Sequence, residues 1–175
     1  MSHNAAQPDP WVAQHLGSLP AGGLVLDLAC GAGRHSKALL DAGHSVLAAD
    51  IDTQSISGMS HPELEVLQYD FESEPWPFPP EFFEGMVVCN YLHRPLLEPI
   101  AASLKPNGVL IYTTFMTGNE AFGRPRNPDF LLQPDELKTI GAGNTQEIAF
   151  VQGSAGKPTN AVKQSIVLKK LAAGY

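Results

Sequence analysis

The sequence predicts an α/β fold with a mostly parallel sheet of seven strands that ends in an antiparallel hairpin. Three observations predict this fold class. Short apolar runs bounded by glycine alternate with segments of helical spacing through the first two thirds of the chain. A glycine-rich turn joins the first of these runs to the first long helical segment. Two further apolar runs, separated by turn-forming residues, follow near the C-terminal end of the sequence.

The first β/α unit gives the clearest signals. Residues 1–10 are polar and are expected to form a flexible tail, and residues 11–19 have the spacing of a short helix. Residues 24–29 (Leu-Val-Leu-Asp-Leu-Ala) form a short apolar run between glycines, which favours a buried parallel strand. Residues 36–42 have helical spacing and stop at a glycine, a frequent C-terminal cap. We expect residues 11–175 to form a single domain.

The same alternation continues through the middle of the chain. Residues 45–50 and 64–69 predict two further strands, and residues 53–58 predict a short helix between them. Residues 85–90 (Gly-Met-Val-Val-Cys-Asn) predict a fourth strand. Residues 95–104 predict a helix, because proline is favoured in a first turn, although a second proline further along could kink it.

The C-terminal third is expected to contain a turn, a strand, a loop, a short helix and the hairpin, at residues 106–108, 109–115, 116–134, 135–140 and 145–171. The loop shows no period and contains several prolines. The hairpin strands, residues 145–151 and 161–171, are separated by the turn-forming residues 153–160. In a sheet of this kind ligands bind beyond the carboxyl ends of the parallel strands, where the strand order reverses.

Composition and charge narrow the class of partner. Hydrophobic residues make up 43% and charged residues 17% of the sequence, as in globular proteins. The N-terminal residues lack the features of a secretory signal and no apolar run is long enough to cross a bilayer, so we expect a cytoplasmic protein. A net charge of −7 disfavours non-specific binding to nucleic acid, although an acidic protein can carry a local RNA-binding patch. Small molecules are the favoured partners, and the oligomeric state is not indicated.

The two cysteines, Cys30 and Cys89, both fall in apolar strand-like segments. Two cysteines are too few for a disulfide framework, and no Cys/His spacing indicates a metal site. We therefore interpret both as small core residues and expect no metal.

The glycine-rich turn, Gly31-x-Gly33, carries the strongest functional signal. Glycine lets the backbone turn tightly and approach a ligand closely, and the following helix start offers free N–H groups. A nicotinamide-binding turn would need a third glycine where Ser36 stands. It would also lack a carboxylate such as Asp27, which would repel a pyrophosphate but suits an ammonium group. Inside an apolar run Asp27 needs a partner, either a local N–H group or a ligand.

Residues 24–36 resemble the first motif of the class I S-adenosylmethionine-dependent methyltransferases, except that Ala29 replaces the usual first glycine. Residues 104–111 are similar to the helix-turn-strand that follows the family's active-site cleft. The resemblance spans residues 12–171, and the overall length and terminal hairpin are similar to the small tellurite-resistance-type group. It implies a Rossmann-like three-layer sandwich and S-adenosyl-L-methionine as the cofactor.

The resemblance also implies which residues bind that cofactor. The family places an acid that binds the ribose hydroxyls at the position of Asp50, and reads the adenine at the positions of Asp70 and Phe71. The full set implied for the cofactor is Asp27, Ala29, Gly31, Gly33, Asp50, Ile51, Asp70, Phe71 and Asn90. Taken singly, Asp50 or Asp70 could equally terminate a strand and start a turn.

Catalysis is expected from the segment after the fourth strand, residues 90–94. Methyl transfer needs a nucleophile aligned with the sulfonium methyl and, for some acceptors, a group that removes a proton. His93 is the best general-base candidate because histidine titrates near neutrality, although it could instead cap the next helix or bond a loop carbonyl. We take His93 and Asn90 as candidate catalytic residues, and Tyr91 and Arg94 as candidate substrate contacts.

The long loop is a candidate lid, because long irregular loops in compact domains are often binding loops. Arg124 and Arg126 lie among its aromatic residues and are expected to face an anionic or aromatic substrate. The alternative is a surface loop that packs its phenylalanines on the core.

The predicted function is S-adenosylmethionine-dependent methyl transfer to a small-molecule acceptor. Three alternatives remain open at this stage. The first is a regulatory module that binds the cofactor without catalysis. The second is a methyltransferase that acts on RNA or protein, and the third is a nicotinamide oxidoreductase.

Overall fold

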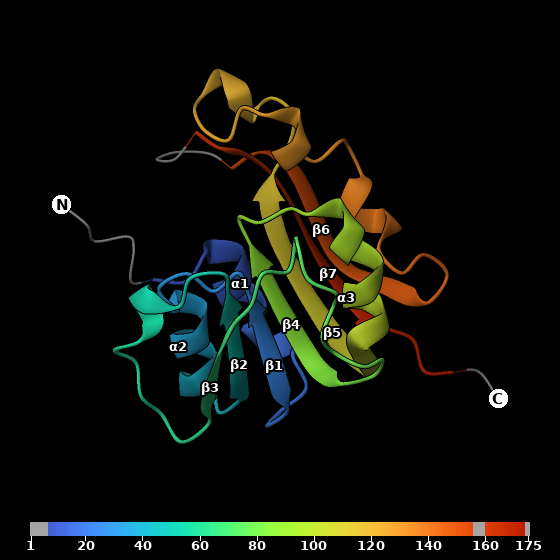
Figure 1. Ribbon diagram of the computed structural model, residues 1–175. Coiled ribbons are helices and arrows are strands. Elements are labelled where there is room, and N and C mark those ends of the chain that lie inside the picture. Colours follow the sequence, from blue (N-terminus) through green and yellow to red (C-terminus); the bar gives the residue numbers. More distant parts are fainter. Residues whose placement is uncertain (1–6, 156–159, 174–175) are drawn as a thin grey trace.

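A single sheet of seven strands, in the order β3-β2-β1-β4-β5-β7-β6, organises the chain (Figure 1). The computed structural model describes residues 7–155 and 160–173. The strands are β1 (Leu24–Leu28), β2 (Ser45–Asp50), β3 (Leu64–Gln68), β4 (Phe83–Cys89), β5 (Leu104–Phe115), β6 (Thr145–Ser154) and β7 (Val162–Lys170). The first five strands run parallel, and β7 runs antiparallel to both β5 and β6. The predicted fold class is confirmed.

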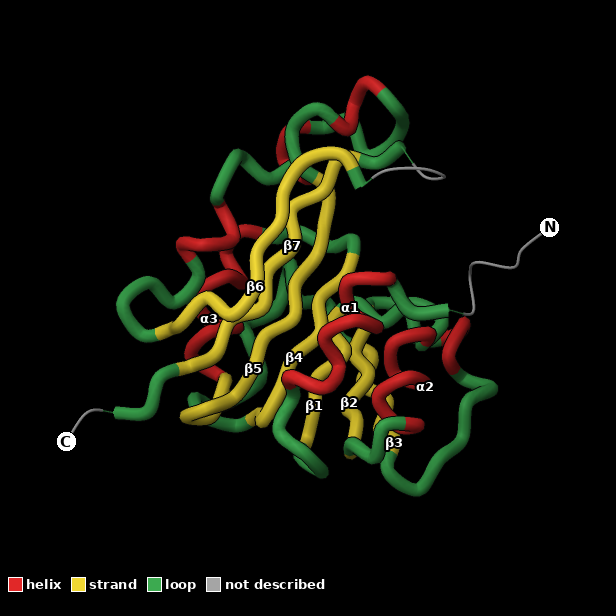
Figure 2. The backbone as a smooth tube through the Cα atoms, turned by 180° about the vertical axis from the view of Figure 1, so that it is seen from behind, coloured by secondary structure: helices red, strands yellow, loops and turns green. Residues whose placement is uncertain are grey.

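Helices cover both faces of the sheet, which makes three layers. α1 (Pro10–His15) and α2 (Arg34–Asp41) lie on one face, seen at the front of Figure 2, and α3 (Leu97–Ser103) lies on the other (Figure 1). The buried side chains form two clusters, one for each face of the sheet. The cluster on the face of α1 and α2 contains Val12 and Leu39, and the cluster on the face of α3 contains Ile100. Side chains alternate across a strand, so the strands between two helical layers are apolar on both faces.

The turn predicted at residues 106–108 lies inside β5 as a bulge. Phe83 pairs with Leu104 and Gly85 with Val109, so the β5 backbone inserts extra residues opposite β4. Asn107 has φ 66°, a left-handed conformation that such a bulge requires. Gly108 is needed there, since a Cβ atom would lie 2.8 Å from the carbonyl oxygen of Lys105.

The two short helices predicted at residues 53–58 and 135–140 form as 3-10 turns, at Gln54–Ile56 and Glu136–Thr139. A third 3-10 turn, Arg94–Leu96, precedes α3. Because α3 begins at Leu97, Pro99 falls in its first turn, where its missing N–H group has no intrahelical partner to lose. The prediction of a kink at Pro99 therefore does not apply.

The predicted tail, residues 1–10, is wrong at its C-terminal end. Residues 1–6 lie outside the described residues, but Asp9 is buried and Pro10 starts α1. The Asp9 carboxylate accepts a hydrogen bond from the Trp11 amide at 2.9 Å, and it pairs with Lys163 Nζ at 3.1 Å. An N-terminal cap and a partly buried ion pair thus fix the entry into α1.

The predicted hairpin turn, residues 153–160, lies partly outside the described residues, which lack 156–159. None of the helices formed by the described residues is long and apolar enough to cross a membrane.

Candidate functional site

The carboxyl ends of β1, β2, β3 and β4 meet along one edge of the sheet, where the strand order reverses between β1 and β4. A crevice outside this edge is where α/β sheets bind ligands. The predicted cofactor residues follow these strand ends, so the fold brings the cofactor set together.

The turn after β1 exposes its backbone to this edge. Gly31 has φ 53° and a Cβ atom there would meet nothing within 4 Å, so a ligand can approach its backbone. Gly33 has φ 84° and caps α2, where a Cβ atom would lie 2.6 Å from Ile56. Ala29 has φ 55°, so the one departure from the family's glycine pattern leaves a strained alanine in the turn.

Asp50 ties the end of β2 to this turn. One carboxylate oxygen, Oδ2, accepts a hydrogen bond from the Gly31 amide at 2.8 Å. The other, Oδ1, accepts one from the Asp52 amide at 3.1 Å. Each oxygen of an exposed carboxylate has a further lone pair for a ligand hydroxyl. The neighbouring Ile51 side chain is 61% exposed, so it offers an apolar surface at the same edge.

Asp27 is fully buried, at 1% exposure, beneath the turn. Its predicted need for a partner is met by Ser36, whose hydroxyl donates a hydrogen bond to Asp27 Oδ2 at 2.6 Å. Burial raises the pKa of Asp27 to about 6, opposed by the bonds from Ser36 and by the charge of Arg34. Because Asp27 is buried, it could influence a ligand at this edge only through its charge and not through direct contact.

Asp70 and Phe71, the residues expected to bind the adenine, follow β3 and differ in their surroundings. Asp70 Oδ1 accepts hydrogen bonds from the Glu72 and Ser73 amides, at 3.0 and 3.2 Å. Bonds from Ser73 and Glu72 lower the pKa of Asp70, so this exposed carboxylate stays ionised. Phe71 is only 7% exposed and packs against Tyr69 and Trp76, with ring centroids 5.0 and 5.6 Å away.

Asn90 and Tyr91, after β4, line a pocket of about 200 Å³. Asn90 has φ 55°, and its amide donates a hydrogen bond to Thr113 O at 2.9 Å. Leu92 of the same segment also lines it, and the remaining lining comes from three other parts of the chain, at Glu72, at Thr114 and Phe115, and at Pro125 and Phe130. The pocket thus lies between the β4 and β5 ends and the long loop.

Glu72 is a pocket residue that the sequence analysis missed. The Tyr91 hydroxyl donates a hydrogen bond to Glu72 Oε1 at 3.3 Å, and burial together with this carboxylate raises the pKa of Tyr91. No sequence signal separates Glu72 from the other acids of the segment, because its partner lies after a different strand.

His93 is half-buried and is not among the residues that line the pocket. The electrostatic interaction with His93 is the smallest of the causes that lower the pKa of Asp70. His93 is the N-cap residue of the 3-10 turn that follows, and its carbonyl accepts a hydrogen bond from the Leu96 amide at 2.9 Å, but its side chain makes no capping hydrogen bond.

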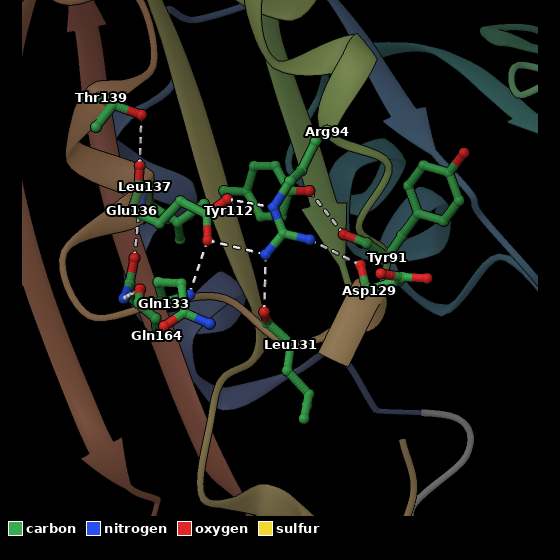
Figure 3. Close-up of polar contacts among 10 residues, drawn as sticks. All are labelled: Tyr91, Arg94, Tyr112, Asp129, Leu131, Gln133, Glu136, Leu137, Thr139 and Gln164. Atoms are coloured by element: carbon green, nitrogen blue, oxygen red, sulfur yellow. Dashed lines mark hydrogen bonds and ion pairs between the residues drawn. The ribbon is translucent and has the colours of Figure 1, made fainter. Parts of the chain in front are cut away.

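Arg94 is held by the chain itself (Figure 3). Its guanidinium forms two hydrogen bonds with the Glu136 carboxylate, at 2.6 and 3.1 Å, and donates to the Leu131 carbonyl at 2.8 Å and the Asp129 carbonyl at 3.0 Å. Four of its five donors are therefore used. This geometry gives Arg94 the task of anchoring the long loop instead of the expected contact with substrate.

Arg124 and Arg126 lie at the exposed tip of that loop. With Pro125, Asn127 and Phe130 they line an open hollow of about 620 Å³. Pro125 and Phe130 also line the smaller pocket, so the hollow and the pocket adjoin.

Cys30 and Cys89 are both buried and free, as interpreted. Burial raises the pKa of the Cys89 thiol to about 11 and of Cys30 to about 12, so neither is a ready nucleophile. Among the residues that the structure describes, no group of three or more His, Cys, Asp or Glu side chains could hold a metal ion.

Comparisons with known proteins find similar sequences and folds. Residues 25–108 match the protein family described as "Methyltransferase domain". YqeM of Bacillus subtilis (strain 168), which carries a provisional methyltransferase name, is 33% identical over 127 residues, covering 64% of this chain. The chain spans about half, 49%, of that relative's length.

Two solved structures show the same fold. An S-adenosylmethionine-dependent methyltransferase from Mesorhizobium loti has a TM-score of 0.71 at 13% identity, over 91% of this chain and 98% of its own. The 1,6-didemethyltoxoflavin-N1-methyltransferase of Burkholderia thailandensis has a TM-score of 0.66 at 18% identity, over 98% and 80%. The latter structure contains 1,6-didemethyltoxoflavin and S-adenosylhomocysteine.

Proposed function

We propose that the chain binds S-adenosylmethionine and methylates a small molecule, because residues 25–108 match the methyltransferase domain family and the chain has the fold of solved S-adenosylmethionine-dependent methyltransferases. The observation that carries this proposal is the hydrogen bond from the Gly31 amide to the Asp50 carboxylate, which places a carboxylate and an open glycine backbone side by side at the edge of the sheet. The cofactor is also supported by the S-adenosylhomocysteine bound in the structure of the similar Burkholderia thailandensis methyltransferase.

The residues at this edge fit the chemistry of the cofactor. Its ribose hydroxyls are donors for the exposed oxygens of Asp50, and its adenine needs an apolar surface such as Ile51 together with a carboxylate such as Asp70. Its ammonium and sulfonium charges suit a turn that has Asp27 beneath it. The open space over Gly31 admits the ligand to the backbone.

When bound, S-adenosylmethionine supplies an electrophilic methyl group, and the chain has to hold and orient the acceptor. Asn90 and Tyr91 stand where the cofactor edge meets the pocket, and Asn90 is the side chain that we propose to orient the acceptor. For acceptors that must lose a proton, we propose His93 or Glu72 as the base. His93→Gln and Glu72→Gln distinguish them, because loss of the base lowers kcat while cofactor affinity is retained.

Two assays test the proposal. Calorimetry with S-adenosylmethionine and, separately, with NADH should show heat of binding for the first only. Binding of NADH instead would overturn the proposal. Incubation with S-adenosylmethionine and a pooled metabolite extract should release S-adenosylhomocysteine. Binding without any such release would favour the non-catalytic module.

A small molecule remains the proposed acceptor, and the net charge of −7 supports it over RNA. A cytoplasmic location is proposed as well. Fractionation of cells that express a tagged chain tests the location.

A further inference from the structure

We propose that the methyl acceptor is a small organic carboxylate whose apolar or single-ring body fills the pocket beside Asn90 and whose carboxylate binds Arg124 and Arg126. This inference rests on the proposed function and names its substrate class. It starts from the way in which the pocket and the hollow adjoin.

Pro125 and Phe130 form the shared boundary of the two spaces. Arg124 and Arg126 flank Pro125 in the chain, so both cations stand beside this boundary. Phe130 is 48% exposed, so its ring offers an apolar surface to a molecule at this boundary. A molecule seated in the pocket would therefore extend toward the two guanidinium groups.

The two arginines are unpaired. In the part of the chain that the structure describes, neither Arg124 nor Arg126 forms a hydrogen bond or an ion pair. Other cations are engaged, as Arg94 is with Glu136 and Lys163 with Asp9. In an acidic protein, two arginines that line one hollow without an intramolecular partner among the described residues are available to an external anion, and the planar guanidinium group suits a carboxylate.

The loop that carries these arginines is anchored at its base. The buried Asn119 accepts a hydrogen bond from the Val162 amide at 3.1 Å and donates one to Pro125 O at 3.4 Å. Arg94 holds the Asp129 and Leu131 carbonyls from the other side (Figure 3). The two arginines therefore lie on a loop that these hydrogen bonds hold in place, so ordering the loop adds less to the entropic cost of binding a ligand.

The walls define the rest of the ligand. Leu92, Phe115 and Phe130 make the pocket largely apolar, and its volume of about 200 Å³ lies below the range of about 300–1,000 Å³ for drug-sized ligands. The body must therefore be small. Glu72 lines the pocket and would repel a negative charge on the body of the ligand, which favours an uncharged body and a single carboxylate at the arginines.

A titration of the whole chain with matched probes tests this inference. The probes are benzoate, phenylacetate and 4-hydroxybenzoate, each with its neutral amide, and ligand-observed NMR measures binding with and without saturating S-adenosylhomocysteine. At least one carboxylate should bind about tenfold more tightly than its amide, as expected for charge-assisted hydrogen bonds. The double variant Arg124→Gln/Arg126→Gln should abolish this preference. Lys169→Gln, at the opposite end of the sheet, is the matched control.

The outcomes separate this inference from the proposed function. Absence of carboxylate binding, equal binding of amide and carboxylate, or a preference that survives the double variant would each overturn it. Tighter, arginine-dependent binding of phenyl phosphate or of a short RNA would also overturn it, in favour of a phosphate ligand. Failure of the unaltered chain to bind S-adenosylhomocysteine would overturn the proposed function instead, and the arm without that ligand would still decide the carboxylate question.

Discussion

Asp50 Oδ2 accepts a hydrogen bond from the Gly31 amide at 2.8 Å, which joins the end of β2 to the turn after β1. The two strands are neighbours in the sheet, but the carboxylate links the segments that follow them. One side chain therefore both shapes the turn and offers oxygens to a ribose.

Replacing Asp50 should affect the cofactor more than the fold. Asp50→Ala and Asp50→Asn should weaken binding of S-adenosylhomocysteine by about tenfold to a hundredfold, since hydrogen bonds to charged groups contribute about 1.5–3 kcal/mol. Calorimetry measures this loss. Asp52→Asn, the neighbouring acid, is the control and should bind normally. Undiminished affinity in Asp50→Ala would contradict the assignment.

Ala29→Gly should stabilise the protein. The alanine has φ 55°, which costs a residue with a Cβ atom about 1–2 kcal/mol, whereas glycine costs about 0.5–1 kcal/mol in backbone entropy. The difference predicts a gain of about 0.5–1 kcal/mol in the free energy of unfolding, measured with urea. Ala32→Gly, in the same turn but without a positive φ, should lose stability. A loss in both variants would show that Ala29 is not strained.

Asp27 should make stability fall as the pH rises. Its pKa is raised from 3.8 to about 6 in the folded chain, so the folded state keeps a proton that the unfolded state has already lost. The contribution of Asp27 to stability therefore decreases between these two values and stays low above them. Asp27→Asn should remove this dependence and raise the free energy of unfolding at pH 7 by up to about 3 kcal/mol.

The same titration should act on the ligand in the opposite sense. Affinity for S-adenosylhomocysteine should increase from about pH 5 to pH 7, because the ionised Asp27 attracts the ammonium group. In Asp27→Asn the affinity should be lower and nearly flat across this interval. Parallel pH profiles for the two proteins would contradict an electrostatic role.

His35 should make the fold sensitive to acid. Its Nε2 accepts a hydrogen bond from the Asp9 amide at 3.0 Å, and burial lowers its pKa from 6.5 to about 4. The unfolded chain gains a proton below the first value, so the stability from neutral His35 is lost as the pH falls toward the second. His35→Gln keeps an acceptor and should flatten this loss in urea unfolding. Because Asp27 acts oppositely over much of this range, the comparison belongs in the Asp27→Asn background.

Breaking the Arg94–Glu136 pair should loosen the long loop. Arg94→Gln removes the charge and three of the hydrogen bonds that hold Asp129, Leu131 and Glu136, at a cost of about 1–2 kcal/mol for a partly exposed pair. Amide exchange over residues 119–132 should accelerate. Lys105→Gln breaks a comparable pair with Glu84 at the other end of β4 and should leave this exchange unchanged.

The sequence predicted elements whose signals are local. The run 45–50 matches β2 residue for residue, and the glycine stop after residue 42 matches the end of α2 closely. Burial on both faces makes such strands apolar throughout, and flanking glycines mark their ends. Because the carboxyl ends of parallel strands lie at the same edge of a sheet, the sequence alone is enough to predict that Asp50 and Asp70 lie at that edge.

Contacts between distant parts of the chain were not predictable in this way. Three hydrogen-bonded pairs depend on how the elements pack against one another. They are Asp27 with Ser36, Glu72 with Tyr91 and Arg94 with Glu136. Arg94 is the clearest case, because its position after β4 suggested substrate, while the fold surrounds it with oxygen atoms of the loop. The entry into α1 was missed for the same reason, since Lys163 comes from the last strand.

The position of β7 between β5 and β6 imposes an order on biosynthesis. A ribosome completes β6 before β7, yet β6 pairs with β7 alone among the described strands. A nascent chain must therefore carry β6 as an unpaired strand until residues 162–170 emerge, when β7 inserts and joins it to β5. During this interval the exposed Ile148 and Val151 leave β6 most open to pairing with another nascent chain.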